Sequence, residues 1–412
     1  MRCSARAPAR CRLLLATLAA CTALDAYATD WQLSLDARLV SSNAEPSFME
    51  GGLGTVRYGS GDAGLQLGRA RLAVTQPLGD LFSAHLDASM YDDQDRSPLG
   101  ITEAYLLFRP YPFDGLRLRV KAGAFYAPLS LENRESGWES PYTQSFSAID
   151  SWLALEVRTL GVEGTLDWLG TRLGHAFDLG VTGGVFGWNQ GAGNVLANDG
   201  FALTDRQTAV FGRVGQPADE PLEGAEPFLQ FNHHAGIYGG LEARWLDRVV
   251  VRVLHYDNRV NPNDADVVAD AYAWQTHFTS AGVRIEGDHG WTGIAQWLDG
   301  ETRSAPDGDA GSWPFKAAYV LVAKRFGRST FSARYDRFEV DSVGSDGDGG
   351  QSGHAWTAAY VFNVDAHWRI TLEWLQVISS SYNRDDLGGP PLLTETQLQL
   401  AVRYALGSRV GY

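Results

Sequence analysis

Apolar and polar residues alternate in short segments along most of this chain, and clusters of Gly, Asp, Asn and Pro separate the segments. The clearest segment runs from 397 to 406, with Leu, Val or Tyr at every even position and Gln, Arg or Ala at every odd one. Similar alternation runs through 116–122 and 237–245. A period of two residues with one apolar side predicts β-strands that have one apolar and one polar face. No helical period extends over a comparable length, so we expect an all-β fold.

The connections between these segments have two lengths, which alternate along the chain. Short turns lie at 76–80, 111–115, 169–173, 246–247, 287–290, 327–328 and 363–366, and long loops lie at 41–62, 91–100, 127–150, 188–233, 257–270, 299–313, 340–353 and 380–393. Fifteen alternating connections predict 16 strands, with both chain ends on the side of the short turns. Short periplasmic turns, long extracellular loops and an even number of antiparallel strands are typical of a transmembrane β-barrel. A further strand-like segment, 208–214, would make the number of strands odd, so we place it inside the loop 188–233. The alternative that 208–214 is itself a strand stays open.

The composition fits such a barrel and excludes several other classes of protein. The mean hydropathy is −0.19 and no apolar run reaches the length of a membrane-spanning helix, whereas a barrel with alternating lipid-facing and water-facing residues keeps this low average. All three cysteines lie at positions 3, 11 and 21, so the rest of the chain has no disulfide framework, Cys-ligated zinc or cysteine nucleophile. With a net charge of −15 we expect no nucleic-acid partner, and no motif calls for a metal, a cofactor or catalytic residues.

The first 28 residues have the pattern of a secretory signal peptide. Arginines precede an apolar stretch at 13–20, and Ala-Tyr-Ala at 26–28 provides a small-x-small cleavage site. Cleavage after Ala28 would leave residues 29–412 as the barrel domain, exported to the outer membrane of a Gram-negative cell. A second interpretation stays open, because the run Leu-Ala-Ala-Cys resembles a lipoprotein signal that would leave a lipidated Cys21 as the first residue.

The chain end and the tryptophans also indicate a protein of the outer membrane. The last alternating segment continues to Tyr412, and a terminal aromatic resembles the signal by which outer-membrane proteins are handed to the barrel-assembly machinery. Aromatic girdles mark the two lipid interfaces of such barrels, and tryptophans near predicted strand ends fit them: Trp31, Trp168, Trp245, Trp291 and Trp368. We therefore expect membrane lipids, lipopolysaccharide and the assembly machinery as partners.

One stretch, Gly123-Ala-Phe-Tyr-Ala-Pro-Leu-Ser-Leu-Glu132, resembles a motif of the phosphate-selective porin family. Members of that family carry a similar Gly-x-Phe-x-x-Pro-(Phe/Leu)-(Gly/Ser)-Leu-Glu sequence where a strand leaves into a pore loop. The resemblance is close in this motif only, and over the rest of the mature chain it is one of architecture.

The resemblance implies a channel of 16 strands that forms homotrimers and has a constriction loop folded inward, here 127–150. The residues of this loop that it implicates are Pro128, Glu132, Arg134 and Glu135. The Lys-rich pore lining of phosphate-selecting members is missing, since the only lysines of this chain are Lys121, Lys316 and Lys324.

The polar faces of the predicted strands would form the wall of the lumen, where cations outnumber acids. By alternation the inward cations are Arg69, Arg71, Arg117, Arg119, Lys121, Arg244, Arg252, Arg284, Arg334, Arg369 and Arg403. The inward acids are Asp87, Glu103, Glu163, Glu242, Asp336 and Glu373. Because the charges on a pore wall set ion selectivity, this excess predicts a mild preference for anions. The run from Arg117 to Lys121 is its strongest part, unless Glu132 and Glu135 of the loop, or acids on neighbouring strands, neutralise it.

Together these patterns predict a passive outer-membrane porin for small hydrophilic solutes, mildly anion-preferring. A substrate-selective channel for phosphate-type anions is the alternative. A barrel with an adhesin, structural or hydrolase role is a further one, and a hydrolase would need a positioned nucleophile and base. The only clusters that suggest a base are Asn-His-His at 232–234 and His255-x-Asp257.

Overall fold

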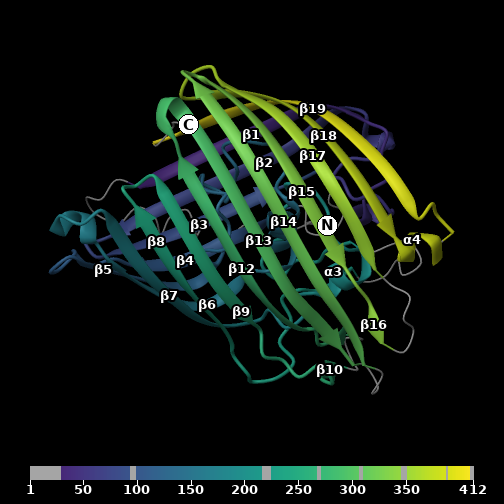
Figure 1. Ribbon diagram of the computed structural model, residues 1–412, viewed down its shortest axis with the longest axis horizontal. Coiled ribbons are helices and arrows are strands. Elements are labelled where there is room, and N and C mark those ends of the chain that lie inside the picture. Colours follow the sequence, from purple (N-terminus) through teal and green to yellow (C-terminus); the bar gives the residue numbers. More distant parts are fainter. Residues whose placement is uncertain are drawn as a thin grey trace, which may run out of the picture.

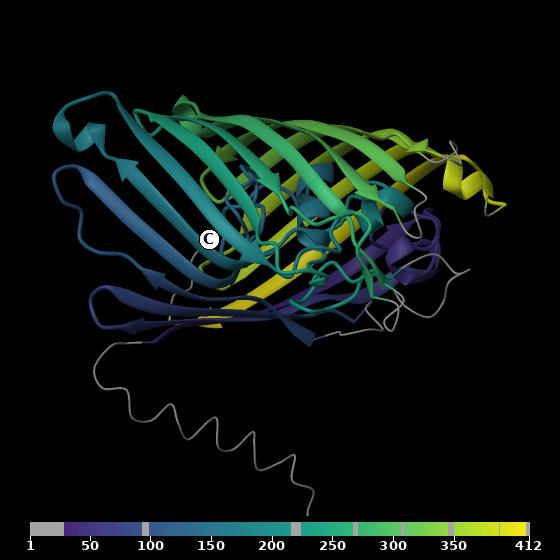
Figure 2. The same cartoon turned by 90° about the horizontal axis from the view of Figure 1, so that it is seen from below.

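The computed structural model describes residues 29–92, 99–215, 224–266, 271–305, 310–344, 350–386 and 388–408. Its long strands are β1 (Asp30–Ser42), β2 (Gly64–Leu78), β3 (Phe82–Met90), β4 (Leu99–Phe108), β5 (Leu116–Phe125), β6 (Thr159–Trp168), β7 (Phe177–Gly187), β8 (Gly236–Trp245), β9 (Val249–Asp257), β12 (Gln275–Glu286), β13 (Trp291–Ser304), β14 (Gly311–Phe326), β15 (Ser329–Val340), β17 (Gln351–Asn363), β18 (Trp368–Ser381) and β19 (Leu392–Gly407). Each is antiparallel to its neighbours, and β1 pairs with both β2 and β19, so the sheet closes into a barrel (Figures 1 and 2).

Shorter elements lie in the connections. They are the 3-10 helices η2 (Phe48–Glu50), η3 (Ser60–Asp62), η4 (Gly170–Leu173) and η5 (Asp288–Gly290), the helices α2 (Ala148–Glu156), α3 (Asn194–Asn198) and α4 (Tyr382–Asp386), and the two-residue strands β10 (Ala265–Asp266), β11 (Ala271–Tyr272) and β16 (Val343–Gly344). No helix in the described part of the chain is long and apolar enough to span a membrane.

The predicted antiparallel barrel of 16 long strands is confirmed. Short and long connections alternate between the strands as the sequence indicated, with one exception: β13 and β14 extend into the predicted long loop 299–313, so only 305–310 lies between them. Residues 208–214 form no strand; they lie in the connection between β7 and β8, where Val214 makes a single bridge to Ala225. The predicted signal peptide at 1–28 and the terminal Tyr412 fall outside the described residues.

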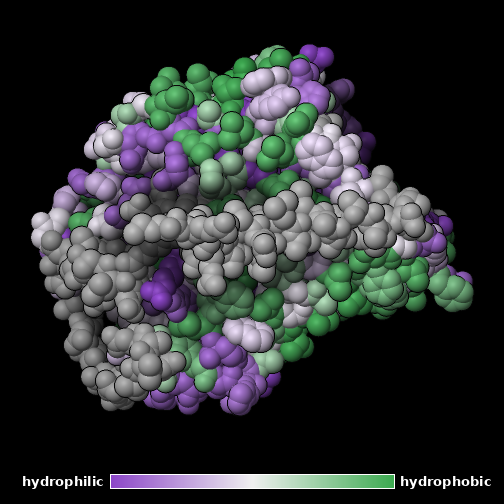
Figure 3. Space-filling view, turned by 180° about the vertical axis from the view of Figure 1, so that it is seen from behind, coloured by the Kyte–Doolittle hydropathy of each residue, from purple (hydrophilic) through white to green (hydrophobic). Residues whose placement is uncertain are grey.

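The outer face of the barrel is apolar because alternate residues of each strand point away from the interior, and most of these outward residues are hydrophobic. On β1 the side chains of Leu33, Leu35 and Leu39 are half exposed, whereas Asp36 and Arg38 are buried inside. Hydrophobic side chains accordingly form broad patches on the surface in the space-filling view (Figure 3). Closed strand pairing satisfies the backbone hydrogen bonds without water, so a barrel with this exterior is suited to lipid.

The inner face differs on one half of the barrel from the polar lumen that strict alternation predicts. From β9 to β18 many inward side chains are apolar and fully buried, among them Leu254, Phe278, Leu298, Phe315, Phe338 and Leu375. Connections that fold into the barrel pack against these side chains. The apolar residues therefore form a core inside this half of the barrel, and buried ion pairs such as Arg334–Asp336 lie among them.

Replacing Leu400 by arginine should lower the free energy of unfolding in lipid vesicles by about 2–4 kcal/mol, the cost of a cation near the middle of a barrel's lipid face. Leu400 lies on the outer face of β19 and pairs with Leu39 of β1. The same change at Leu392, the exposed first residue of β19, should cost at most about 1 kcal/mol, because depth in the bilayer sets the penalty. Denaturant titration measures both, and equal losses would contradict this placement of the strand in the membrane.

Candidate functional site

Two long connections fold into the barrel and fill part of its interior. The segment predicted as a constriction loop, 127–150, lies inside with nearly all of its side chains buried, and α2 continues it. The connection between β7 and β8 adds α3 and a buried stretch at 200–209. The teal helical ribbons of these connections lie within the outline of the strands (Figures 1 and 2). We call the segment 127–150 the inward loop.

The helix at the end of the inward loop begins at a capped residue and packs against the apolar wall. Ser147 caps α2, since its hydroxyl accepts a hydrogen bond from the backbone N–H of Asp150. Trp152 then contacts Phe278 and Phe315 edge-on, with ring centroids 5.1 and 5.0 Å away. Aromatic contacts of this geometry add to the free energy gained by burying the rings, so they hold the helix on this side.

Arg334 on β15 is the centre of the polar contacts that bind the inward loop to the same side. Its fully buried guanidinium forms ion pairs with Glu132 of the loop at 2.7 Å and with Asp336 of its own strand at 2.8 Å. It also donates hydrogen bonds to the backbone carbonyls of Ser145 and Phe146, each at 2.8 Å. One arginine therefore binds a side chain and the backbone of the loop together.

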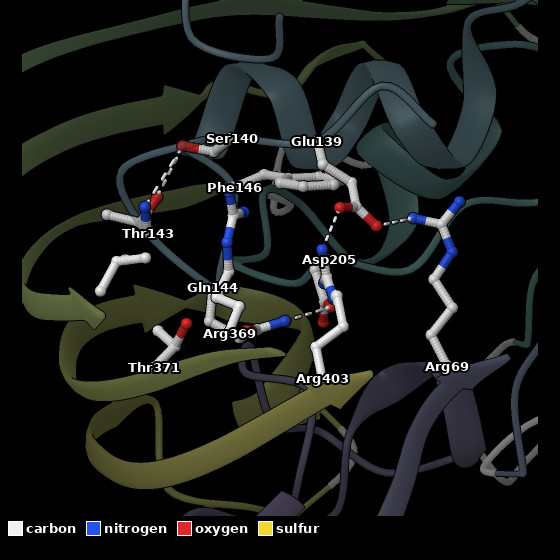
Figure 4. A pocket seen from close by; sticks show the side chains of 11 residues that line it. Arg69, Glu139, Ser140, Thr143, Gln144, Phe146, Asp205, Arg369, Thr371 and Arg403 are labelled. Atoms are coloured by element: carbon white, nitrogen blue, oxygen red, sulfur yellow. Dashed lines mark hydrogen bonds and ion pairs between the residues drawn. The ribbon is translucent and has the colours of Figure 1, made fainter. Parts of the chain in front are cut away.

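A second group of ion pairs joins both inward connections to β1, β2 and β19, and Figure 4 shows part of it. Glu139 of the inward loop lies between Arg69 and Arg403, and Asp205 accepts hydrogen bonds from Arg38. Burial raises the pKa of the Glu139 carboxyl, but the charges of Arg403 and Arg69 outweigh burial and lower it to about 2. Burial likewise opposes the charge of Arg38 at Asp205, yet the pKa of Asp205 stays well below its usual range. Both carboxylates are thus ionised anchors.

Five of the predicted lumen cations lie beneath the inward connections and not on an open wall: Arg69, Arg71, Arg334, Arg369 and Arg403. Arg71 pairs with Asp87, and Arg369 binds Glu135 of the inward loop with two hydrogen bonds of 2.7 and 2.8 Å. A buried guanidinium is tolerated only when carboxylates or carbonyls pair with it. These arginines point inward as alternation predicts, but the loops cover them and supply partners to them in addition to the strand acids Asp87 and Asp336.

Asp150, in the first turn of α2, is a buried carboxyl that no arginine contacts directly among the described residues. Its Oδ2 accepts a hydrogen bond from the Ser130 hydroxyl at 2.6 Å, and its Oδ1 has no hydrogen-bond partner in that part of the chain. Burial, reinforced by the charge of Glu132, raises the pKa of Asp150 well above its usual range. The side chain is therefore a neutral acid over a wider pH range than an exposed aspartate.

Asp150→Asn should make the stability of the barrel less dependent on pH. In the native protein the folded state binds the Asp150 proton more tightly than the unfolded state does, so the free energy of unfolding falls as pH rises above the unfolded pKa of about 3.9. Asparagine has no proton to lose, and toward alkaline pH the variant should be the more stable protein by about 1–3 kcal/mol, the cost of an unsatisfied buried group. Denaturant unfolding at acidic and alkaline pH measures this; a constant difference between the two proteins would contradict it.

The wall from β5 to β9 keeps a polar, partly open surface. Arg117 and Arg119 pair with Asp167 at 2.9 and 3.2 Å, and Lys121 pairs with Glu163 at 3.4 Å. The side chains of the three cations are 27–37% exposed, whereas those of the two carboxylates are 2% and 5% exposed. The cations are therefore the more exposed partners of these ion pairs, and the carboxylates are buried.

Two arginines continue this surface on β8 and β9. Arg244 and Arg252 both bind Glu242, and again the arginines are more exposed than the carboxylate. Arg252 also donates hydrogen bonds to the carbonyl oxygens of Pro128 and Ser130 at 2.9 and 3.0 Å. It thus ties the edge of the inward loop to the basic wall. We call the cations of β5, β8 and β9 the basic wall: Arg117, Arg119, Lys121, Arg244 and Arg252.

Cross-strand acids, and not the inward loop, are the partners of the β5 cations. Glu132 and Glu135 of the loop bind arginines of β15 and β18 on the other side of the interior. Asp167 and Glu163 on the neighbouring strand β6 take their place, because antiparallel register sets Arg117 opposite Asp167. Arg117, Arg119 and Lys121 are therefore paired with acids on an adjacent strand and not with the glutamates of the inward loop.

The remaining predicted residues are dispersed. Arg284 of β12 and Arg134 of the inward loop meet at Glu286, with N–O distances of 3.4 and 3.2 Å. His255 lies on the outer face of β9 with its ring hydrogen-bonded to Thr279, so it is turned away from the interior. Among the described residues, no group of three His, Cys, Asp or Glu side chains is placed to hold a metal ion.

Sequence reasoning missed several residues of the site. Asp167 shares the face of Glu163 on β6, and Arg38 shares the inward face of β1, so a stricter use of alternation would have found both. Glu139 and Asp205 lie in irregular loop segments. No local pattern indicates which loop carboxylates turn inward, since their partners come from strands far away in the sequence.

Solved structures with a similar barrel fold are known, and the three described next share little sequence with this chain. OmpT, an outer membrane protein of Vibrio cholerae in its trimer form, is 9% identical, covers 93% of this chain and 100% of its own, and has a TM-score of 0.53. The outer membrane channel DcaP of Acinetobacter baumannii is 12% identical, with coverages of 92% and 96% and a TM-score of 0.51. Salmonella typhi OmpF, in a complex with daunomycin, is 10% identical, with coverages of 92% and 97% and a TM-score of 0.52.

This likeness shows that the fold is that of outer-membrane β-barrels. No protein-family model matches the sequence, and no curated protein is significantly similar to it. The chemistry of the interior must therefore be argued from its own residues.

Proposed function

We propose that the protein is a passive channel of the Gram-negative outer membrane for small hydrophilic solutes, with a modest preference for anions. The observation that carries this proposal is the basic wall, where exposed cations cover buried carboxylates. Wall charges in a confined space of low dielectric raise the local concentration of counter-ions. The barrel fold supports the membrane location.

The path of the solute would run along β5–β9, because loops and apolar side chains fill the opposite half of the interior. The inward loop would form the constriction where its Pro128 edge meets Arg252. A path confined to the β5–β9 side of the interior implies a pore that lies to one side of the barrel axis.

The proposal includes export by the signal peptide at 1–28 and insertion by the barrel-assembly machinery through Tyr412. It also includes contact with lipopolysaccharide and assembly as a homotrimer. The trimer form in which OmpT of Vibrio cholerae is described supports this oligomeric state.

A substrate-selective channel for phosphate-type anions is the second candidate. It is favoured by the four arginines of the basic wall, because planar guanidinium groups match phosphate and carboxylate oxygens with paired hydrogen bonds. The adhesin, structural and hydrolase alternatives gain no support from the interior, and His255 lies on its outer face.

Planar-bilayer recording tests the proposed function. The detergent-purified full chain should give stepwise current increases in KCl, and a salt gradient across the bilayer should give a reversal potential of the sign that anion passage predicts. Protein that enters the bilayer without conductance steps would refute the channel, and a cation-selective reversal potential would refute the preference.

A further inference from the structure

A cavity of about 140 Å³ lies on the inner face of the basic wall, with Pro128 of the inward loop on one side. Its floor consists of small residues from β6, β7 and β8: Thr165, Gly180, Thr182 and Gly240. The two threonine hydroxyls lie 3.1 Å apart, so they offer the cavity paired polar atoms. A side chain at Gly180 would come within 2.9 Å of the Asp167 carboxylate, so the glycine keeps this space empty.

Cations line the cavity from two sides. Arg119 and Lys121 approach from β5, and Arg244 and Arg252 approach from β8 and β9. Each guanidinium has five N–H donors, and the three carboxylates of this wall cannot accept from all of them. The Nε–H of Arg119 is buried and has no hydrogen-bond partner among the described residues. The cavity thus holds more donors than the protein itself satisfies.

A second cavity lies next to the first, toward the end of the barrel that carries the turn 109–115. It has a volume of about 330 Å³, lies beside the turn 109–115, and is lined by Arg109, Arg117 and Arg119. Arg119 borders both cavities. Arginine side chains therefore line both cavities, and the second cavity also has the carboxylate of Asp80 in its lining.

We infer that the cavity is a saturable binding site for a small oxyanion, a carboxylate or a tetrahedral anion such as sulfate, held between the cations of β5 and those of β8 and β9. The ligand would accept from the guanidinium groups and from one of the hydroxyls of Thr165 and Thr182, the one that does not donate to the other. Asp167 limits the affinity, because it occupies three arginines of the wall at once. This inference rests on the proposed channel for access but assigns the site its own ligand class.

The experiment is a titration of KCl current through the full chain in bilayers with potassium sulfate and, in a separate arm, potassium acetate. Chloride current should fall to a plateau, and the more effective salt identifies a tetrahedral or a carboxylate ligand. Arg119→Gln and Thr182→Val should raise the half-blocking concentration, the arginine change by about tenfold, as loss of a charge-assisted hydrogen bond predicts. Asp167→Asn should lower it, and Arg303→Gln on the outer face should leave it unchanged.

A current that both salts change only in proportion to ionic strength, equally in all variants, would overturn the site while the channel stands. If no conductance appears, calorimetric titration of the purified protein with sulfate separates the two ideas. Heat of binding that Arg119→Gln abolishes would support the site without the channel, and absence of heat would overturn the site as well.

Discussion

Arg334→Ala should lower the free energy of unfolding by about 3–5 kcal/mol and increase the single-channel conductance. The substitution leaves Glu132 and Asp336 buried without their cation, which is the costly way to break an ion pair. The backbone carbonyls of Ser145 and Phe146 lose their donor at the same time. The inward loop should therefore leave the wall in part of the molecules, which widens the path. Denaturant titration and bilayer recording measure the two effects.

Arg337→Ala is the matched control, because Arg337 lies on the outer, exposed face of the same strand. It should change stability by no more than about 0.5 kcal/mol, as surface substitutions do. Arg334→Lys keeps the charge but not the planar guanidinium, so its loss of stability should lie between those of Arg334→Ala and Arg337→Ala. It is also the variant to measure if Arg334→Ala does not fold. Wild-type conductance and protease resistance of Arg334→Ala would show that the loop is held by its apolar contacts alone.

The fold could be predicted from the sequence because the barrel has local signals. Alternation in 397–406 follows from the pleat of β19, and the two classes of connection follow from the two ends of the barrel. Gly123 of the family motif is another local signal. Its φ is 135°, and a Cβ there would lie 2.2 Å from the carbonyl oxygen of Ala104. Only glycine therefore fits where β5 approaches β4 closely, which explains the glycine at the start of the motif.

The filling of the interior could not be predicted in the same way. Alternation shows that Arg334 and Arg117 point inward, but it cannot show that a loop covers the first and leaves the second open. That difference depends on where Glu132 and Trp152 lie, and both are placed by contacts with strands more than 100 residues away. Inward apolar residues such as Phe315 were a clue, since a water-filled lumen offers them no partner.

The triple change of Arg117, Arg119 and Lys121 to Gln should abolish the preference for anions and favour cations. The three cations are more exposed than the acids they pair with, and without them the buried Asp167 and Glu163 lose most of their partners. The wall would then carry uncompensated negative charge. We expect the ratio of chloride to potassium permeability to fall about two- to fivefold, which corresponds to a change of about 1 kT in the free-energy difference between the two ions in the field of the wall. Reversal potentials in a KCl gradient measure the ratio.

The control for this prediction is a triple substitution on the outer face that removes the same amount of positive charge. Arg303, Lys316 and Arg337 lie on the outside of β13, β14 and β15, and their change to Gln alters the net charge by the same amount without touching the lumen. The long loops carry net negative charge, as in 257–270 with four aspartates and one arginine. The Debye length is about 10 Å at 0.1 M salt and about 30 Å at 0.01 M, so only dilute salt lets these loops oppose the potential of the wall. Anion preference should therefore rise from dilute to physiological salt in the wild type and in the outer variant. Loss of selectivity in the outer variant, or its persistence in the lumen variant, would place the selectivity filter elsewhere than on β5.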